Sequence, residues 1–434
     1  MESILDLEQL LSSLPKGYIS KKVINGKERF YLQSRQGSKI KSEYIPSRQV
    51  EELREKLAKR KEIEEKIASI YRSAPSFLVP SLTAQSLTGS VMEGDEAVAT
   101  FVNGVMTYID EKKAPMLLCR VHDLRGWLEN RAIDSHRTNS RLLKRALRLK
   151  DHSDLSSALA SHAATITDDY WFKAAKSKLK YADIRFNNDA YAYVALRGDS
   201  LLAPKKPLST PELTQRGSFE KCWRIIEGRW TMVKSGSPME LFSEWFCSEL
   251  AKKLGIPTAE YRIEGDCILT DNFAADANLE PMSSLTGEDD DYEAVFPAVY
   301  RLSAELAKQY LLLMWFDCLI YNVDRHSENM GFLRNRRNGK IISLAPNYDN
   351  NLALFSRGMP KDPYRKKDGM ISLFLKFLSS SDEAKRIYVS IALPQLSKKD
   401  FDEIISRSPV EVDEDFLWQF LENGYLQLDN KLLM

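Results

Sequence analysis

Cysteine and histidine are scarce in this 434-residue sequence, and neither residue is arranged as a ligand set. The five cysteines are widely separated and include no Cys-x-x-Cys pair, which argues against a disulfide framework and a zinc knuckle. The five histidines include no His-Glu-x-x-His motif, so nothing supports a zinc hydrolase. Because this cysteine usage is typical of reducing compartments, we expect a cytoplasmic protein.

Long apolar segments and an excess of one charge are also missing. The strongest apolar run, 310–316, is far shorter than the roughly 20 residues that span a bilayer, so we expect no membrane association. The N-terminus has neither the basic start nor the apolar stretch of a signal peptide. With 62 Lys and Arg against 61 Asp and Glu, the chain is not a strongly basic nucleic-acid coat. Its length predicts two or three domains.

Residues 1–75 are expected to form a basic module. Residues 16–47 alternate polar and apolar around Asn25-Gly26, which predicts a β-hairpin, and residues 48–71 have the periodicity of a long amphipathic helix. Residues 16–72 contain 16 Lys and Arg but 8 Asp and Glu, an excess of eight positive charges. This asymmetry predicts contact with DNA; the alternative is a solvated helix that packs on the next domain or dimerises.

The rest of the chain is divided by a Pro-rich connector at 201–216. We expect an accessory region at 90–205 and a core at 206–434, in which a β-rich lobe (206–274) precedes a helical lobe (275–434). The fold class predicted is therefore α+β, with two lobes and a cleft between them.

The most informative segment is the loop from Asp324 to Asn329, between an apolar helix and a strand. In phosphoryl transfer an aspartate orients the attacking hydroxyl, and an amide oxygen beside it ligates Mg²⁺; Asp-x-x-x-x-Asn supplies both groups. Asp349 follows the strand 340–344 and offers a second hard oxygen ligand. Upstream, Lys234 ends a strand and Glu244 lies on the next helix, as in sites where a glutamate holds a phosphate-binding lysine. The order of these residues favours a phosphotransferase.

The segment from about 209 to 400 resembles the HipA-like kinase family. The motifs that carry this resemblance are Thr-Gln-Arg-Gly-Ser-Phe-Glu-Lys at 214–221, Val-Lys at 233–234, Glu-Trp-Phe-Cys at 244–247, Asn-Val-Asp-Arg-His-Ser-Glu-Asn at 322–329 and Tyr-Asp at 348–349. Residues 120–175 are similar to an upstream region of some HipA-like proteins of Gram-positive bacteria. The absence of Ala-Pro-Glu and Asp-Phe-Gly also fits a HipA-type site.

Carried over position by position, the resemblance implies that Asp324 is the catalytic base. It implies that Asn329 and Asp349 are magnesium ligands. It makes Lys234 the phosphate-binding lysine and Glu244 its helix partner.

The resemblance also implies how ATP is enclosed. Asn272 and Phe273 would line the adenine pocket where the lobes meet. Residues 214–221 would cover the phosphates and bind ATP through Gly217, the only glycine of the loop, and Ser218. In HipA kinases a hydroxyl in this loop becomes phosphorylated; Thr214 is the candidate here, with Ser218 as the substitute.

The function that the resemblance implies is an ATP- and Mg²⁺-dependent serine/threonine protein kinase, a growth-regulating toxin with a protein substrate in translation, such as an aminoacyl-tRNA synthetase, and an antitoxin partner. Phosphoinositide kinases also carry Asp-Arg-His-x-x-Asn, so a lipid or small-molecule kinase is an alternative. A DNA-associated regulatory protein is another.

Overall fold

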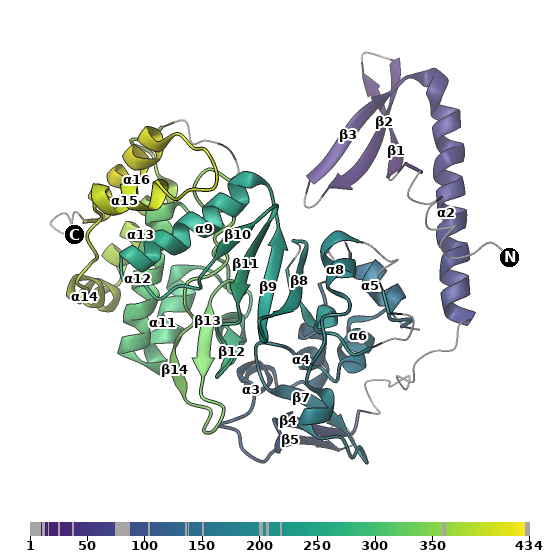
Figure 1. Cartoon of the computed structure of the whole chain (residues 1–434), viewed down its shortest axis with the longest axis horizontal. Coiled ribbons are helices and arrows are strands. Elements are labelled where there is room, and N and C mark those ends of the chain that lie inside the picture. Colours follow the sequence, from purple (N-terminus) through teal and green to yellow (C-terminus); the bar gives the residue numbers. More distant parts are fainter. Residues whose placement is uncertain are drawn as a thin grey trace.

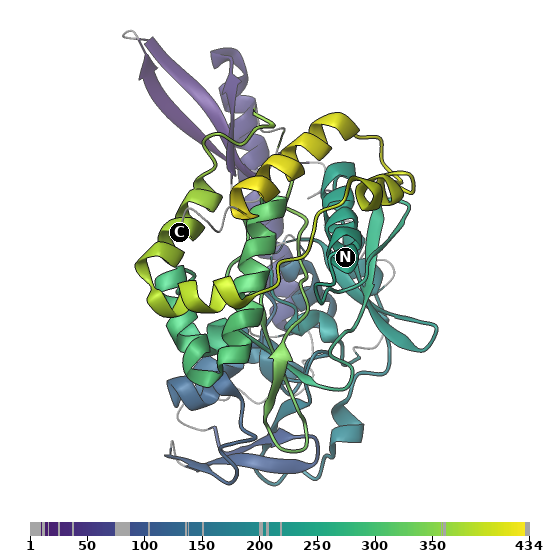
Figure 2. The ribbon, with the colours of Figure 1, turned by 90° about the vertical axis from the view of Figure 1, so that its left-hand side faces the viewer.

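The computed structural model has an α+β fold, as predicted (Figures 1 and 2). It describes residues 10, 14–15, 17–24, 27–36, 39–73, 87–102, 105–134, 137, 139–149, 152–198, 203–204, 208–217, 219–356, 358 and 362–429. None of the helices in these ranges is long and apolar enough to cross a bilayer.

The N-terminal module contains one strand more than the predicted hairpin. Its antiparallel strands β1 (Tyr18–Ile24), β2 (Lys27–Gln36) and β3 (Lys39–Ile45) are followed by η1 (Ser47–Gln49) and the long helix α2 (Val50–Ser73). The pairing of Ile24 with Lys27 leaves a two-residue connection, although Asn25-Gly26 itself lies outside the described residues. The third strand arises because the polar-apolar alternation continues beyond Gln36.

The accessory region combines a four-stranded antiparallel sheet with short helices. The sheet order is β6-β5-β4-β7. Its strands and helices are β4 (Gly89–Glu93), β5 (Glu96–Val102), β6 (Val105–Tyr108), α3 (Met116–Val121), α4 (Leu124–Asn130), α5 (Ser140–Ala146), α6 (Asp154–Ala160), β7 (Tyr170–Ala174), α7 (Tyr181–Ile184) and α8 (Ala192–Arg197). In Figures 1 and 2 this sheet lies at the opposite end of the molecule from the C-terminal helices.

The β-rich lobe has a four-stranded sheet of order β10-β11-β9-β8. Its elements are η4 (Pro211–Thr214), β8 (Lys221–Ile226), β9 (Arg229–Ser235), α9 (Pro238–Lys253), β10 (Arg262–Glu264) and β11 (Cys267–Asp271). Helix α9 begins at a capping box, in which Ser237 and Glu240 satisfy each other's backbone N–H groups. It ends before Gly255, whose φ of +67° favours glycine.

Side chains of the accessory region pack on both faces of this sheet. On one face Cys222, Val233 and Leu269 share an apolar cluster with Leu143 of α5 and Tyr191, which caps α8; α8 packs directly on β8 (Figure 1). On the opposite face, Trp223 and Met232 join a second cluster with accessory side chains, Trp171 and Phe186 among them. The connector at 201–216 therefore divides the sequence into two regions, but these regions share hydrophobic clusters.

The helical lobe surrounds one central helix. Helix α12 (Ala304–Ile320) is apolar on nearly all sides and its side chains are buried, as expected of a helix in the middle of a core. Around it lie α10 (Ser283–Thr286), α11 (Tyr292–Leu302), α13 (Gly369–Ser380), α14 (Asp382–Ser390), α15 (Lys398–Ile405) and α16 (Glu414–Asp429). The lobe also has a small sheet of β12 (Asn278–Pro281), β13 (Gly331–Arg334) and β14 (Ile341–Leu344).

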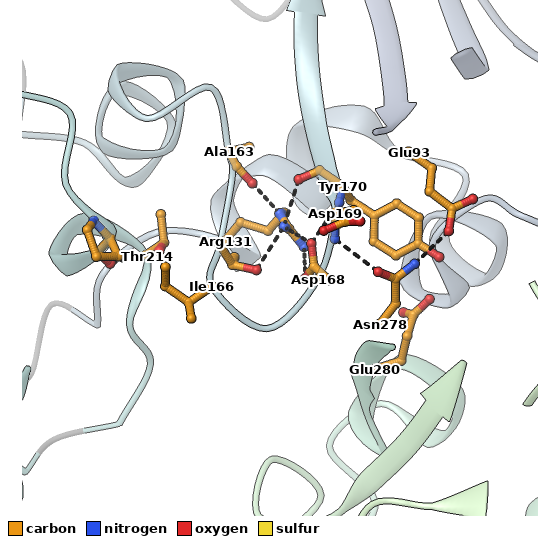
Figure 3. A network of polar contacts seen from close by, with 12 residues as sticks. Glu93, Arg131, Ala163, Ile166, Asp168, Asp169, Tyr170, Thr214, Asn278 and Glu280 are labelled. Carbon is orange, nitrogen blue, oxygen red and sulfur yellow. Dashed lines mark hydrogen bonds and ion pairs between the residues drawn. The ribbon is translucent and has the colours of Figure 1, made fainter. Parts of the chain in front are cut away.

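Polar contacts join strand β12 to the accessory region (Figure 3). The amide of Asn278 accepts a hydrogen bond from the backbone of Asp169 over 2.9 Å and donates to Glu93 over 2.7 Å. Burial raises the pKa of Glu93 to about 7, so this carboxyl is poorly solvated. The accessory region thus contacts both lobes.

Candidate active site

Lys234 lies between two carboxylates from different lobes. Its Nζ is 3.2 Å from Glu244 Oε1, on helix α9, and 2.7 Å from Asp349 Oδ1, after strand β14. Burial opposes the charge of the lysine, but Asp349 and Glu244 outweigh it and raise the pKa of Lys234 well above its usual value. Burial also disfavours the Asp349 carboxylate, yet Lys234 and Lys221 hold its pKa at about 2. Lys234 and Asp349 are therefore a charged pair.

Lys221 is a second cation beside this pair, and the sequence motifs did not assign it a role. It pairs with Lys234 in the β8–β9 register, so both side chains lie on the same face of the sheet. Burial lowers the pKa of Lys221 to about 8, although Asp349 opposes this shift. A Cβ added at Gly217, whose φ is +91°, would lie 2.8 Å from Lys221 Nζ. The glycine therefore allows the loop to approach this ammonium group.

The loop from Asp324 to Asn329 is organised by Arg325. This guanidinium donates to both oxygens of Asp317 over 2.9 Å, to the backbone oxygen of Tyr348 over 2.7 Å, and to the backbone oxygen of Asn329. A single side chain thus ties the two ends of the loop to the segment that carries Asp349.

Both predicted magnesium ligands are held in place locally, Asn329 by a side-chain hydrogen bond and Asp349 by its backbone conformation. Asn329 donates through Nδ2 to the backbone oxygen of Asp324 over 3.0 Å, and this bond orients its amide group. Asp349 has a φ of +61°, which is unusual for a residue with a side chain and is found mainly where the surroundings impose it. Its backbone N–H donates to the hydroxyl of Tyr261 over 3.2 Å.

The two residues predicted for the adenine pocket differ in their contacts. Phe273 packs on Tyr348, with ring centroids 5.3 Å apart, so it lies beside the segment that carries Asp349. The amide of Asn272 instead donates to the backbone oxygen of Ile166 in the accessory region over 3.0 Å and accepts from the backbone of Ala274. The side chain of Asn272 is therefore already engaged by protein groups.

Thr214, the first predicted phosphorylation site, is the last residue of η4. Thr214 is buried and its hydroxyl donates to the backbone oxygen of Pro211 over 2.8 Å. Ser218 lies outside the described residues. The structure therefore brings Lys234, Glu244 and Asp349 into contact and links Asp324 to Asn329, while Thr214 faces away from solvent.

The profile of the HipA-like C-terminal domain family matches residues 221–410. This chain contains a HipA-like C-terminal domain. The resemblance predicted from the motifs is thus confirmed for this segment, and the matched range begins at the first residue of strand β8. Residues 2–55 match a domain of unknown function, DUF6788, which ends inside helix α2.

Solved structures similar to the chain include two bacterial proteins. A proinflammatory kinase, CtkA, of Helicobacter pylori is 19% identical over 48% of this chain and 91% of its own, with a TM-score of 0.38. HipA of Shewanella oneidensis MR-1, from a toxin–antitoxin complex with HipB and operator DNA, is 14% identical over 80% of this chain and 98% of its own, with a TM-score of 0.48. No curated protein matches the chain.

Proposed function

We propose that the chain is an ATP- and Mg²⁺-dependent serine/threonine protein kinase of HipA type. The observation that carries this proposal is the contact of Lys234 with both Glu244 and Asp349, because it joins three chemically distinct parts of a phosphotransferase at one point.

The donor set suits Mg²⁺, a hard cation that prefers oxygen ligands. Asp349 is ionised well below neutral pH, and Asn329 contributes an amide oxygen from a loop tied to the Asp349 segment by Arg325. These two residues would hold the ion, which would neutralise charge on the phosphates. Lys234 would then bind the phosphates of ATP, and Lys221 would add a second positive charge near the loop.

Asp324 would accept the proton of the attacking hydroxyl. Its loop is fixed by the Asn329 amide and by Arg325, so its backbone position is set before a substrate binds. On this proposal the protein orients the hydroxyl and balances the charge on the phosphates, which is most of what phosphoryl transfer requires.

Thr214 would be the site of autophosphorylation. Because its hydroxyl is buried and bonded to Pro211, a phosphate there could not be accommodated in the described conformation. Modification would therefore require residues 214–217 to leave their place. Mass spectrometry after incubation with ATP should find phosphate at Thr214, or at Ser218; phosphate only at other residues would remove this part of the proposal.

The wider role that we propose is that of a growth-regulating toxin, with a protein substrate in translation and an antitoxin partner. It rests on the HipA-like domain and the motif resemblance. Comparison of the phosphoproteomes of cells that express the wild type or Asp324→Ala would identify the substrate. A phosphate on lipid head groups alone, after incubation with labelled ATP, would instead favour a lipid kinase.

Contact with DNA is proposed for residues 16–72, on the excess of eight positive charges in that segment. Binding of duplex DNA that weakens with salt, and is lost when residues 1–75 are deleted, is the expected result. No binding at low salt would exclude this contact.

A further inference from the structure

One guanidinium of the accessory region contacts both ends of the loop 214–221. Arg137, only 1% exposed, donates through Nη1 to Gln215 Oε1 over 3.1 Å, at the start of the loop. Its Nη2 donates to the backbone oxygen of Lys221, at the end of the loop, and to that of Ala195 over 3.2 Å. The side chain thus fixes the separation of the two loop ends.

Backbone contacts from the accessory region reinforce this arrangement. The N–H groups of Ile133 and Asp134 donate to the carbonyl oxygens of Leu213 and Gln215 over 2.6 and 3.2 Å. From the loop, Arg216 donates back to the carbonyl oxygen of Asn130 over 2.9 Å. The first half of the loop therefore runs along the accessory segment 130–134 and is held by it.

A buried acid completes the base of the loop. Glu212 accepts from the backbone of Trp223 over 2.8 Å and from the Gln215 amide over 2.7 Å, so it too spans both ends of the loop. Its carboxylate lies 3.9 Å from Arg137. Burial raises the pKa of Glu212 to about 8, although Arg137 opposes this shift. The two hydrogen bonds that Glu212 accepts, from Trp223 and Gln215, hold the base of the loop together.

This base is connected to the candidate active site at two points. Lys221, whose carbonyl oxygen binds Arg137, is the cation that faces Asp349. Arg216 forms an ion pair over 3.4 Å with Glu328, which lies between the predicted catalytic base and Asn329. A shift of the loop ends would therefore move a phosphate-facing cation and break a contact with the catalytic loop.

We infer that Arg137 is a positioning residue for the loop 214–221: together with the backbone contacts of residues 130–134, this side chain sets the loop over the nucleotide phosphates. The inference rests on the proposed function, because it assigns the loop to phosphates. It adds that nucleotide affinity in the HipA-like domain is controlled from outside the domain.

The test is Arg137→Lys, which keeps the charge but replaces the planar fork with one ammonium group. The matched control is Arg365→Lys, because Arg365 is also buried but its guanidinium bonds groups of the helical lobe, Asp368 and the carbonyl oxygens of Leu319 and Cys318. The first measurement is tryptic cleavage after the exposed Arg216, in the full-length protein without nucleotide. Arg137→Lys should accelerate this cleavage about tenfold over Arg365→Lys, because proteolysis follows the population of the opened loop.

The second measurement is steady-state kinetics. Arg137→Lys should raise KM for ATP about tenfold and change kcat little, because the loop contributes to nucleotide binding and not to the chemical step. Equal cleavage rates in the two variants, or an unchanged KM, would overturn the inference. If Arg137→Lys does not fold, Gln215→Met removes the loop-side acceptor with little change in volume and should give the same two results. Faster cleavage in a protein without kinase activity would support the loop contact and reject the proposed kinase.

Discussion

Two charged clusters meet at Asp349, and they are built differently. In the arginine cluster, Arg325 bonds Asp317, and the two side chains are only 4% and 2% exposed. In the lysine cluster, Lys234 contacts Glu244 and Asp349 and keeps 13% of its side chain exposed, while Asp349 keeps 22%. The first cluster is sealed from solvent, and the second is open on one side.

The chemistry of the two cations explains the difference. A guanidinium is planar and donates in fixed directions, so it suits a permanent joint, and Arg325 also bonds Asn347 and Asn350. An ammonium group is a compact charge on a flexible stem and can exchange partners. The comparison teaches that the sealed cluster positions the loops, whereas the open cluster is where a ligand can enter.

The largest effect should come from Asp349, in the open cluster, and from Asp324, the proposed catalytic base. Asp324→Ala and Asp349→Ala should each lower phosphate transfer by at least about a thousandfold, because each removes a group that acts only in the transition state or on the metal. Transfer from labelled ATP measures the rate, and Asp349→Ala should also weaken Mg²⁺-ATP binding. Asp276→Ala, at an exposed position, serves as the control. Wild-type turnover in Asp324→Ala would show that the site is wrongly assigned.

The next largest effect is on stability. Arg325→Leu should lower the free energy of unfolding by about 3–5 kcal/mol, because it leaves the buried Asp317 carboxylate without its partner. Urea denaturation measures this loss. Arg337→Leu, at an exposed position, should change the free energy by about 0.5 kcal/mol or less. If Arg325→Leu were as stable as the wild type, the arginine cluster could not be the joint described here.

Lys234→Met should separate activity from stability. We expect phosphate transfer to fall at least about a hundredfold. The free energy of unfolding should change by less than about 2 kcal/mol, because Glu244, whose pKa burial already raises, can take up a proton, and Asp349 keeps Lys221 and partial exposure to water. Paired kinetic and urea measurements on one preparation test this. A loss of stability as large as that of Arg325→Leu would show that the lysine cluster is as structural as the arginine cluster.

The smallest effect is a dependence on pH. The pKa of Lys221 is lowered to about 8, so the side chain is charged below that pH and becomes neutral above it. Affinity for ATP should therefore fall by about threefold to tenfold as pH rises from about 7 to about 9. KM measured across this range tests the sign. In Lys221→Met the slope should flatten; an equal slope in both proteins would assign the titration to another group.

Local sequence was sufficient for the parts of the site that lie within short segments. The loop from Asp324 to Asn329, the β8–β9 hairpin that carries Lys234, and the cap of helix α9 all follow from neighbouring residues. Lys221 could have been found as well, because a hairpin that turns at Glu227-Gly228 pairs it with Lys234.

Contacts between distant segments could not be read in this way. Arg137 and Lys221 are 84 positions apart, and Asn272 and Ile166 are 106 apart. No local pattern encodes such pairs, since a buried arginine in an irregular segment looks in sequence like an ordinary surface residue. The packing of the accessory region on both faces of the β8–β11 sheet was missed for the same reason.

The coverage of that sheet has a consequence for synthesis on the ribosome. The accessory region emerges before the strands it covers, so its apolar surfaces, Trp171 and Phe186 on one side and Leu143 and Tyr191 on the other, stay unpaired until the strand that ends at Asp271 has been made. Two incomplete hydrophobic cores therefore stay exposed in the nascent chain while about a hundred further residues are translated. Residues 206–434 alone would expose the surfaces of the sheet that the accessory region covers, so we expect this segment to be less stable without residues 90–205.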